Sequence, residues 1–124
     1  MLESICNPDC TPLFETALEL ANDDEALARR LLHMIVETNR STLDSLRACV
    51  AADDWAGVGS AAHHIAGSAR MLGRYGLLAA LIHLEGTARQ RDIPLLTIVL
   101  PRVVDAIEHL DRSIEETLGF DGGL

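Results

Sequence analysis

Apolar residues recur every three or four positions along most of this chain, which is the spacing of amphipathic helices. A short first helix is predicted over residues 12–21, because Thr11 is a suitable N-cap and Pro12 suits the first helical position. Its expected apolar side consists of Leu13, Ala17 and Leu20.

A much longer second helix is predicted over residues 22–51. Asn22 is its expected N-cap, and Glu25 completes the spacing of a capping box three residues later. Seven apolar or small residues with three-and-four spacing form the expected buried stripe: Leu27, Leu31, Ile35, Thr38, Thr42, Leu46 and Cys49.

The third and fourth predicted helices are shorter. Either Asp53 or Asp54 can cap the third helix, which ends at Gly73, a residue type favoured just past a helix end. Its expected buried stripe is Val58, Ala61, Ala62, Ile65, Ala69 and Leu72. The fourth helix covers residues 75–91 and is expected to bury Leu77, Leu78, Leu81, Leu84 and Ala88.

A fifth helix is predicted to begin at residues 92–94, whose sequence Asp-Ile-Pro favours a helix start. It is expected to run to Leu118 and to end at Gly119. Pro101 removes one backbone donor, so we expect it to kink or split this helix. The residues expected to face inward are Leu96, Leu100, Val103, Ile107, Leu110 and Ile114.

The pattern predicts an all-α fold, because strand-like alternation is absent from the sequence. Four long amphipathic helices with short connections favour an antiparallel four-helix bundle, to which the first segment adds a short N-terminal helix. We expect residues 1–11 to be a tail or the end of a linker, residues 12–119 to form the bundle, and residues 120–124 to be a C-terminal tail.

Composition narrows the function classes. The formal net charge is −9, and all ten basic residues are arginines, so the chain is expected to repel nucleic acid and anionic membrane surfaces. No apolar run approaches the ~20 residues that span a bilayer, and the N-terminus lacks the pattern of a signal peptide. The three cysteines, Cys6, Cys10 and Cys49, favour idle thiols in the cytoplasm over a disulfide or a metal site.

The candidate chemistry lies in the third helix, around His63. Gly67 interrupts this helix at a cost of about 1 kcal/mol relative to alanine, so it requires an explanation. The residues expected one turn either side of His63 on its face are all small: Gly59, Ser60, Ala66 and Gly67. Arg70 follows along the same face. We interpret this surface as an accessible imidazole nucleophile that serves a partner protein, whereas His64, about 100° around the helix, is interpreted as structural.

The stretch from Ala62 to Gly73 resembles the signature of histidine-containing phosphotransfer (HPt) domains. The matching segments are Ala62-His63, Gly67-Ser68-Ala69 and Leu72-Gly73, together with Asp54-Trp55 and Leu84-Glu85 in the flanking regions. The resemblance covers nearly the whole chain and is greatest to the HPt module that closes hybrid sensor histidine kinases.

The resemblance implies that His63 accepts a phosphoryl group through Nε2 and that Glu85 accepts a hydrogen bond from its Nδ1. Gly67 would be the position of close approach for a receiver domain. The implied partners are receiver domains of a hybrid kinase and of a response regulator. No cofactor is expected in this chain, because Mg²⁺ belongs to the receiver, and a monomer is expected in isolation.

One residue departs from the family pattern. The usual lysine three residues after the histidine is Ala66 here, and Arg70 is either its substitute, a receiver contact or a solvated charge. The alternative function is a helical adaptor that binds a partner without phosphorylation. A metal site using His63, His64 and Glu85 or a cysteine is disfavoured, because adjacent helical histidines point about 100° apart. The chain has no kinase domain and is not expected to be an autonomous enzyme.

Overall fold

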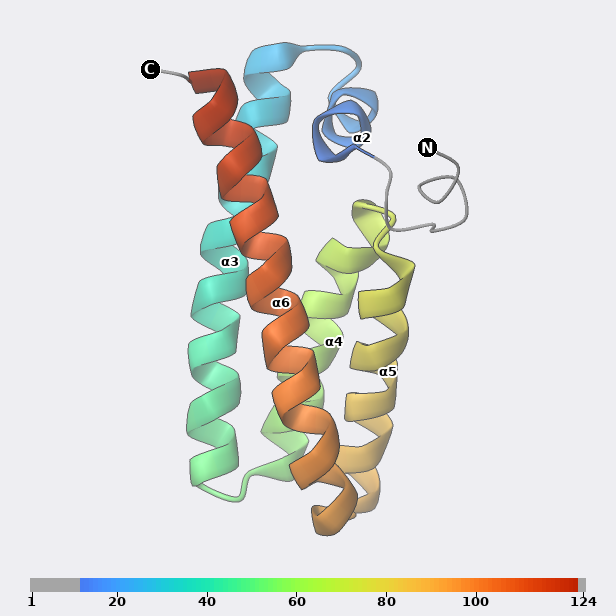
Figure 1. Ribbon diagram of the computed structural model, residues 1–124. Coiled ribbons are helices and arrows are strands. Elements are labelled where there is room, and N and C mark those ends of the chain that lie inside the picture. The colour runs from blue at the N-terminus through green and yellow to red at the C-terminus, as the bar shows by residue number, and fades with distance from the viewer. Residues whose placement is uncertain (1–11, 123–124) are drawn as a thin grey trace.

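The computed structural model describes residues 12–122, which contain five α-helices and no strand (Figure 1). The helices are α2 (Leu13–Leu20), α3 (Glu25–Ala51), α4 (Trp55–Met71), α5 (Tyr75–Gln90) and α6 (Ile93–Gly122). Helices α3 to α6 form an antiparallel bundle, and the short α2 lies at the end of the bundle where α3 begins (Figure 1). The predicted fold class is therefore confirmed.

Each bundle helix contacts two neighbours, in the cyclic order α3, α4, α5, α6, and the most extensive contact joins α4 to α5. The buried side of α4 explains this close approach, because it is rich in alanine. Small side chains let two helix backbones come near each other. The buried alanines of α4 are Ala61, Ala62, Ala66 and Ala69.

The core consists of leucine, isoleucine, valine and alanine from all five helices. All six residues of the stripe predicted for α4 are buried, and the stripes predicted for α5 and α6 are buried except for the half-buried Leu78 and Leu100. On α2, Leu13 and Ala17 are buried as predicted, whereas Leu20 is 47% exposed. Leu20 belongs to the last turn of α2, where the chain turns toward α3.

The predicted N-terminus of α3 is wrong. Asn22 and Asp23 adopt the left-handed conformation in the turn that follows α2, so neither begins a helix. Asp24 is the N-cap instead, and its Oδ1 accepts a hydrogen bond of 3.1 Å from the backbone N–H of Leu27. Thr11, the N-cap predicted for the first helix, lies outside the described residues, and Pro12, predicted as the first helical residue, is instead the N-cap of α2.

The stripe predicted for α3 is also mostly wrong, since only Ile35 and Leu46 of its seven residues are buried. Leu27 and Thr38 are exposed, and the other three are half-buried. The residues that α3 does bury are Ala28, Leu32, Ile35, Val36, Asn39, Leu43 and Leu46. Apolar residues adjoin one another in α3, so two overlapping stripes fit its sequence. The stripe that is buried contains a polar residue, Asn39.

Helix α6 is continuous through Pro101, so the proline does not split it. Proline has no backbone N–H, so the carbonyl four residues before Pro101 lacks its helical partner. Because Pro101 is exposed, this carbonyl lies near solvent. The helix also continues through Gly119 to Gly122, past the boundary expected at residue 119. A glycine inside a helix costs only about 1 kcal/mol, and Gly119 is not enough to end this one.

Helices α3 and α6 are joined by a buried polar pair, Asn39 and Asp111. Asn39 is 0% exposed and Asp111 is 6% exposed, and the amide Nδ2 of Asn39 donates a 3.0 Å hydrogen bond to Asp111 Oδ1. Burial raises the pKa of Asp111, against the opposing effects of the Asn39 hydrogen bond and the nearby Arg40, while Glu108 raises this pKa further. The side-chain oxygen Oδ1 of Asn39 is buried and has no hydrogen-bond partner among the residues that the structure describes.

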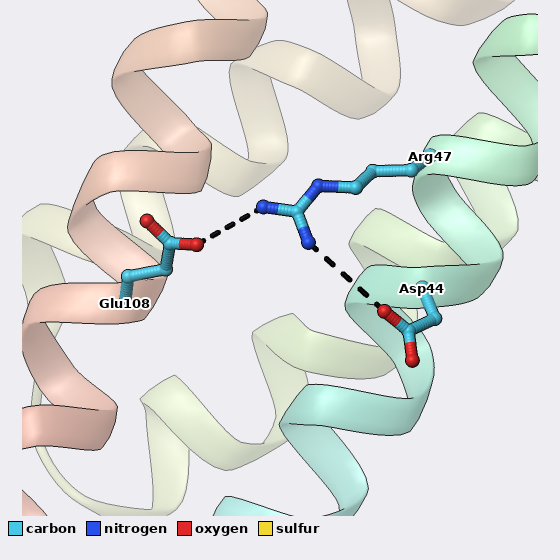
Figure 2. Close-up of polar contacts among 3 residues, drawn as sticks. All are labelled: Asp44, Arg47 and Glu108. Atoms are coloured by element: carbon cyan, nitrogen blue, oxygen red, sulfur yellow. Dashed lines mark hydrogen bonds and ion pairs between the residues drawn. The ribbon is translucent and has the colours of Figure 1, made fainter.

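Exposed ion pairs flank the seam between the same two helices. Arg47 of α3 reaches across to Glu108 of α6, with 3.0 Å between Nη2 and Oε2, and it also lies 4.0 Å from Asp44 of its own helix (Figure 2). Arg40 forms a further ion pair with Glu115. Because these side chains are largely solvated, they contribute little to the free energy of folding compared with the buried core.

Candidate functional site

His63 lies in the middle of α4 with its side chain 77% exposed. Its Nδ1 is 3.5 Å from Oε1 of Glu85, which projects from α5 and is only 22% exposed. The contact between α4 and α5 thus brings together the two residues that the sequence singled out. The separation exceeds the usual hydrogen-bond length of about 2.9 Å, and a small side-chain movement would close it.

Arg89, one turn after Glu85 on α5, completes this arrangement. Its Nη2 donates a 2.8 Å hydrogen bond to Oε2 of Glu85, so the carboxylate lies between the guanidinium and the imidazole. The hydrogen bond from Arg89 to one oxygen limits the rotation of the carboxylate while its other oxygen lies toward the imidazole. Sequence reasoning missed Arg89, although the i,i+4 spacing of Glu85 and Arg89 is typical of a helical ion pair.

The two glycines on this face of α4 differ in their surroundings. A Cβ added at Gly67 would meet nothing within 4 Å in residues 12–122, so packing among these residues does not require glycine there. A Cβ added at Gly59 would lie 3.8 Å from Cγ of Glu85, which puts the backbone of Gly59 directly against the carboxylate-bearing side chain. Gly67 therefore leaves open space next to the imidazole, and Gly59 lies beside the residue that contacts it.

Ala66 does not lie on the exposed face, contrary to expectation. It is 4% exposed and belongs to the core. Three residues advance a helix by about 300°, which places Ala66 about 60° around the helix from His63, at the edge of the buried stripe. Ser60 and Arg70 are exposed as expected, and Gly67 is half-buried.

His64 faces a different helix. Its Nδ1 is 3.4 Å from the hydroxyl oxygen of Thr42 on α3, so the two adjacent histidines have separate neighbours. Nowhere in residues 12–122 do three or more His, Cys, Asp or Glu side chains gather so that they could hold a metal ion. The described part of the chain thus offers no support for a metal site formed by His63, His64 and Glu85.

A shallow cavity of about 300 Å³ lies between α4 and α5, next to Glu85. Its lining combines small residues with charged ones: Trp55, Ala56, Gly59, Ser60, Glu85, Ala88, Arg89 and Arg91. Sequence reasoning did not identify this cavity, because its two walls, residues 55–60 and residues 85–91, are separated in the sequence by most of α4 and α5.

The family model of the Hpt domain matches residues 30–113, which include His63, Glu85 and most of the four-helix bundle. The chain therefore belongs to the Hpt (histidine-containing phosphotransfer) domain family, and its role is histidine phosphotransfer in two-component signalling. The expected resemblance to hybrid sensor kinases is confirmed.

Curated relatives include the virulence sensor protein BvgS of Bordetella pertussis and that of Bordetella parapertussis. Each is 36% identical to this chain over 84 residues, which cover 65% of this chain and 7% of the relative. The matched region is thus a small part of each relative's length. No solved structure gives a significant match. None of the helices in residues 12–122 is both long enough and apolar enough to cross a membrane.

Proposed function

We propose that His63 accepts a phosphoryl group from the aspartyl phosphate of one receiver domain and passes it to the aspartate of another. The observation that carries this proposal is the exposed imidazole of His63 with its Nδ1 against the carboxylate of Glu85. A carboxylate at Nδ1 favours the tautomer that has its proton there, which leaves the lone pair on Nε2 free to attack.

In this mechanism, Nε2 of His63 attacks phosphorus in line as the bond from phosphorus to the aspartyl oxygen breaks. The aspartate leaves as a carboxylate, and the proton on Nδ1 remains in place. The imidazole ring gains positive charge as the new N–P bond forms, and the negative charge of Glu85 stabilises that ring. Catalysis by this chain is therefore positioning together with charge neutralisation.

The same surface suits a second protein. The open space at Gly67 allows a partner's backbone to approach the imidazole, and the exposed Arg70 is available as a contact. The expected Mg²⁺ belongs to the partner, and a monomeric state and a cytoplasmic location remain part of this proposal. The proposed partners are the receiver domains of a hybrid kinase and of a response regulator.

The test is transfer of labelled phosphate from a phosphorylated receiver domain to the chain. The label on the chain is detected on a gel before and after acid treatment. His63→Gln should abolish the acid-labile label while leaving the helical circular dichroism unchanged. His64→Gln is the matched control and should be labelled like the natural sequence. A label that persists in His63→Gln refutes the assignment. Partner binding by His63→Gln without any phosphate on the natural chain would instead favour the adaptor function.

A further inference from the structure

Four helices of this protein end in the same kind of turn. In each turn the first or second residue after the helix has a positive φ, and the N–H of the residue that follows it donates to the carbonyl oxygen five residues earlier. These residues are Asn22 after α2, Asp53 after α3, Gly73 after α4 and Arg91 after α5, and Asp23, next to Asn22, also has a positive φ. Glycine, asparagine and aspartate tolerate this left-handed conformation, whereas arginine does so poorly.

Arg91 therefore stands where a glycine would make the fold more stable. Its φ is 57°, close to the 55° of Asn22 and the 56° of Asp53. Its exposed side chain forms no hydrogen bond or ion pair with any residue in the described range 12–122. Backbone hydrogen bonds close the turn, but no interaction of the Arg91 side chain within residues 12–122 compensates for the unfavourable backbone conformation. Such strain is characteristic of positions that serve a function.

Arg91 is one of the residues that line the cavity between α4 and α5. This cavity is adjacent to the site of His63, because Glu85 lines the cavity and also contacts the imidazole. The guanidinium of Arg89, also in the lining, is occupied by Glu85, whereas that of Arg91 has no such partner. The exposed Ser60 adds a hydroxyl group to the same lining.

We propose that Arg91 and Ser60 bind a carboxylate side chain of the protein that docks over His63. A guanidinium matches a carboxylate with two parallel hydrogen bonds, and a serine hydroxyl can donate another. The local positive charge also suits this occupant, because a chain with net charge −9 repels acidic partners elsewhere on its surface. This inference rests on the proposed function, since it names a contact of the same docking partner.

The experiment replaces Arg91 by glycine, which removes the guanidinium and relieves the backbone strain in one step. Phosphotransfer from a phosphorylated receiver domain should become about twofold to fivefold slower in kcat/KM at low salt, as expected for one exposed ion pair. The difference should vanish at high salt. The melting temperature of Arg91→Gly should rise by about 2–4 °C. A gain in stability together with a loss in transfer is the signature of a residue retained for binding.

Two controls separate docking from chemistry. Phosphoramidate, a small phosphate donor that needs no docking surface, should label Arg91→Gly and the natural sequence at equal rates. Arg30→Gln removes an equal charge from the first turns of α3, at the opposite end of the bundle from the end of α5 (Figure 1), and should leave receiver transfer unchanged. If His63 takes phosphate neither from the receiver domain nor from phosphoramidate, the proposed function itself is refuted.

Two outcomes would overturn the inference about Arg91 alone. One is receiver transfer at the natural rate in Arg91→Gly at low salt. The other is a loss in transfer that phosphoramidate labelling shares, because that result would assign Arg91 to the chemistry or the fold. Arg91→Lys should restore part of the lost rate, since it keeps the charge and loses only the paired geometry.

Discussion

The buried pair of Asn39 and Asp111 leads to a prediction about stability. Replacing Asp111 by asparagine keeps the shape and the acceptor oxygen, and it removes a charge from a residue that is 6% exposed. The new amide can also donate to the carbonyl oxygen of Asn39, which is buried and unpaired in the natural protein. We therefore expect Asp111→Asn to be more stable than the natural sequence near neutral pH.

The magnitude follows from the groups involved. Leaving a buried polar atom unpaired costs about 1–3 kcal/mol, and the ionised carboxylate loses its attraction to Arg40 when it is replaced. Because pairing the Asn39 oxygen outweighs the lost attraction to Arg40, we expect the free energy of unfolding of Asp111→Asn to be about 1 kcal/mol higher at neutral pH. This difference is equivalent to about 3–5 °C in melting temperature.

The pH dependence has a definite sign. The pKa of Asp111 is raised in the folded protein, so the folded state binds the proton more tightly than the unfolded state does. The natural protein is therefore stabilised below the ordinary pKa of aspartate, and it loses that stability as pH rises through the raised pKa. Asparagine does not titrate, so the advantage of Asp111→Asn should grow as pH increases from acid to neutral.

The assay is urea unfolding followed by circular dichroism at about pH 4, 5 and 7. Asp105→Asn, an exposed carboxylate on the same helix, is the matched control and should change the free energy of unfolding by less than about 0.5 kcal/mol. A loss of stability in Asp111→Asn at neutral pH, or a gain independent of pH, would refute the reasoning.

Three further predictions concern other sites. Gly57→Ala should destabilise the fold by about 1–2 kcal/mol, because its Cβ would lie 2.5 Å from both the capping Asp54 carboxylate and the Cys49 sulfur. Gly67→Ala should instead stabilise the fold by about 1 kcal/mol. Thermal melts in which the melting temperatures of the two variants shift in the same direction would contradict this prediction. Gly67→Gln should keep the fold and slow receiver transfer at least about tenfold, and normal transfer would rule out close approach at Gly67. Burial and the neighbouring Asp54 raise the pKa of Cys49, so iodoacetamide should modify Cys49 in the folded protein more slowly than in urea at mildly alkaline pH; equal rates would contradict that cause.

The success of the sequence prediction varied between helices for physical reasons. In α4, small residues and isolated aliphatic residues left one possible buried stripe, and that stripe was predicted correctly. In α3, adjacent apolar pairs such as Leu31 and Leu32 allowed two stripes, and local spacing could not choose between them. The stripe that is buried includes Asn39, whose partner Asp111 is 72 residues away in the sequence, so contacts between helices that local spacing does not contain distinguish the two stripes.

The candidate site shows the same limit. The positions of His63 on an exposed face and of Glu85 opposite it followed from a motif and a helix period. The cavity that Glu85 and Arg89 line depends on the relative placement of α4 and α5. The hydrophobic pattern of one helix does not contain that information. Ala66 was misplaced because a residue at the edge of a stripe is buried or exposed according to how near the neighbouring helix lies.

The central claim is that His63 carries the phosphoryl group on Nε2. Phosphorus and nitrogen NMR of the chain, labelled with ¹⁵N in histidine and phosphorylated by a receiver domain, tests it directly. We predict one phosphorus coupled to Nε2 of His63, with the proton still on Nδ1. Phosphate on Nδ1, on His64 or on no histidine at all would contradict the account.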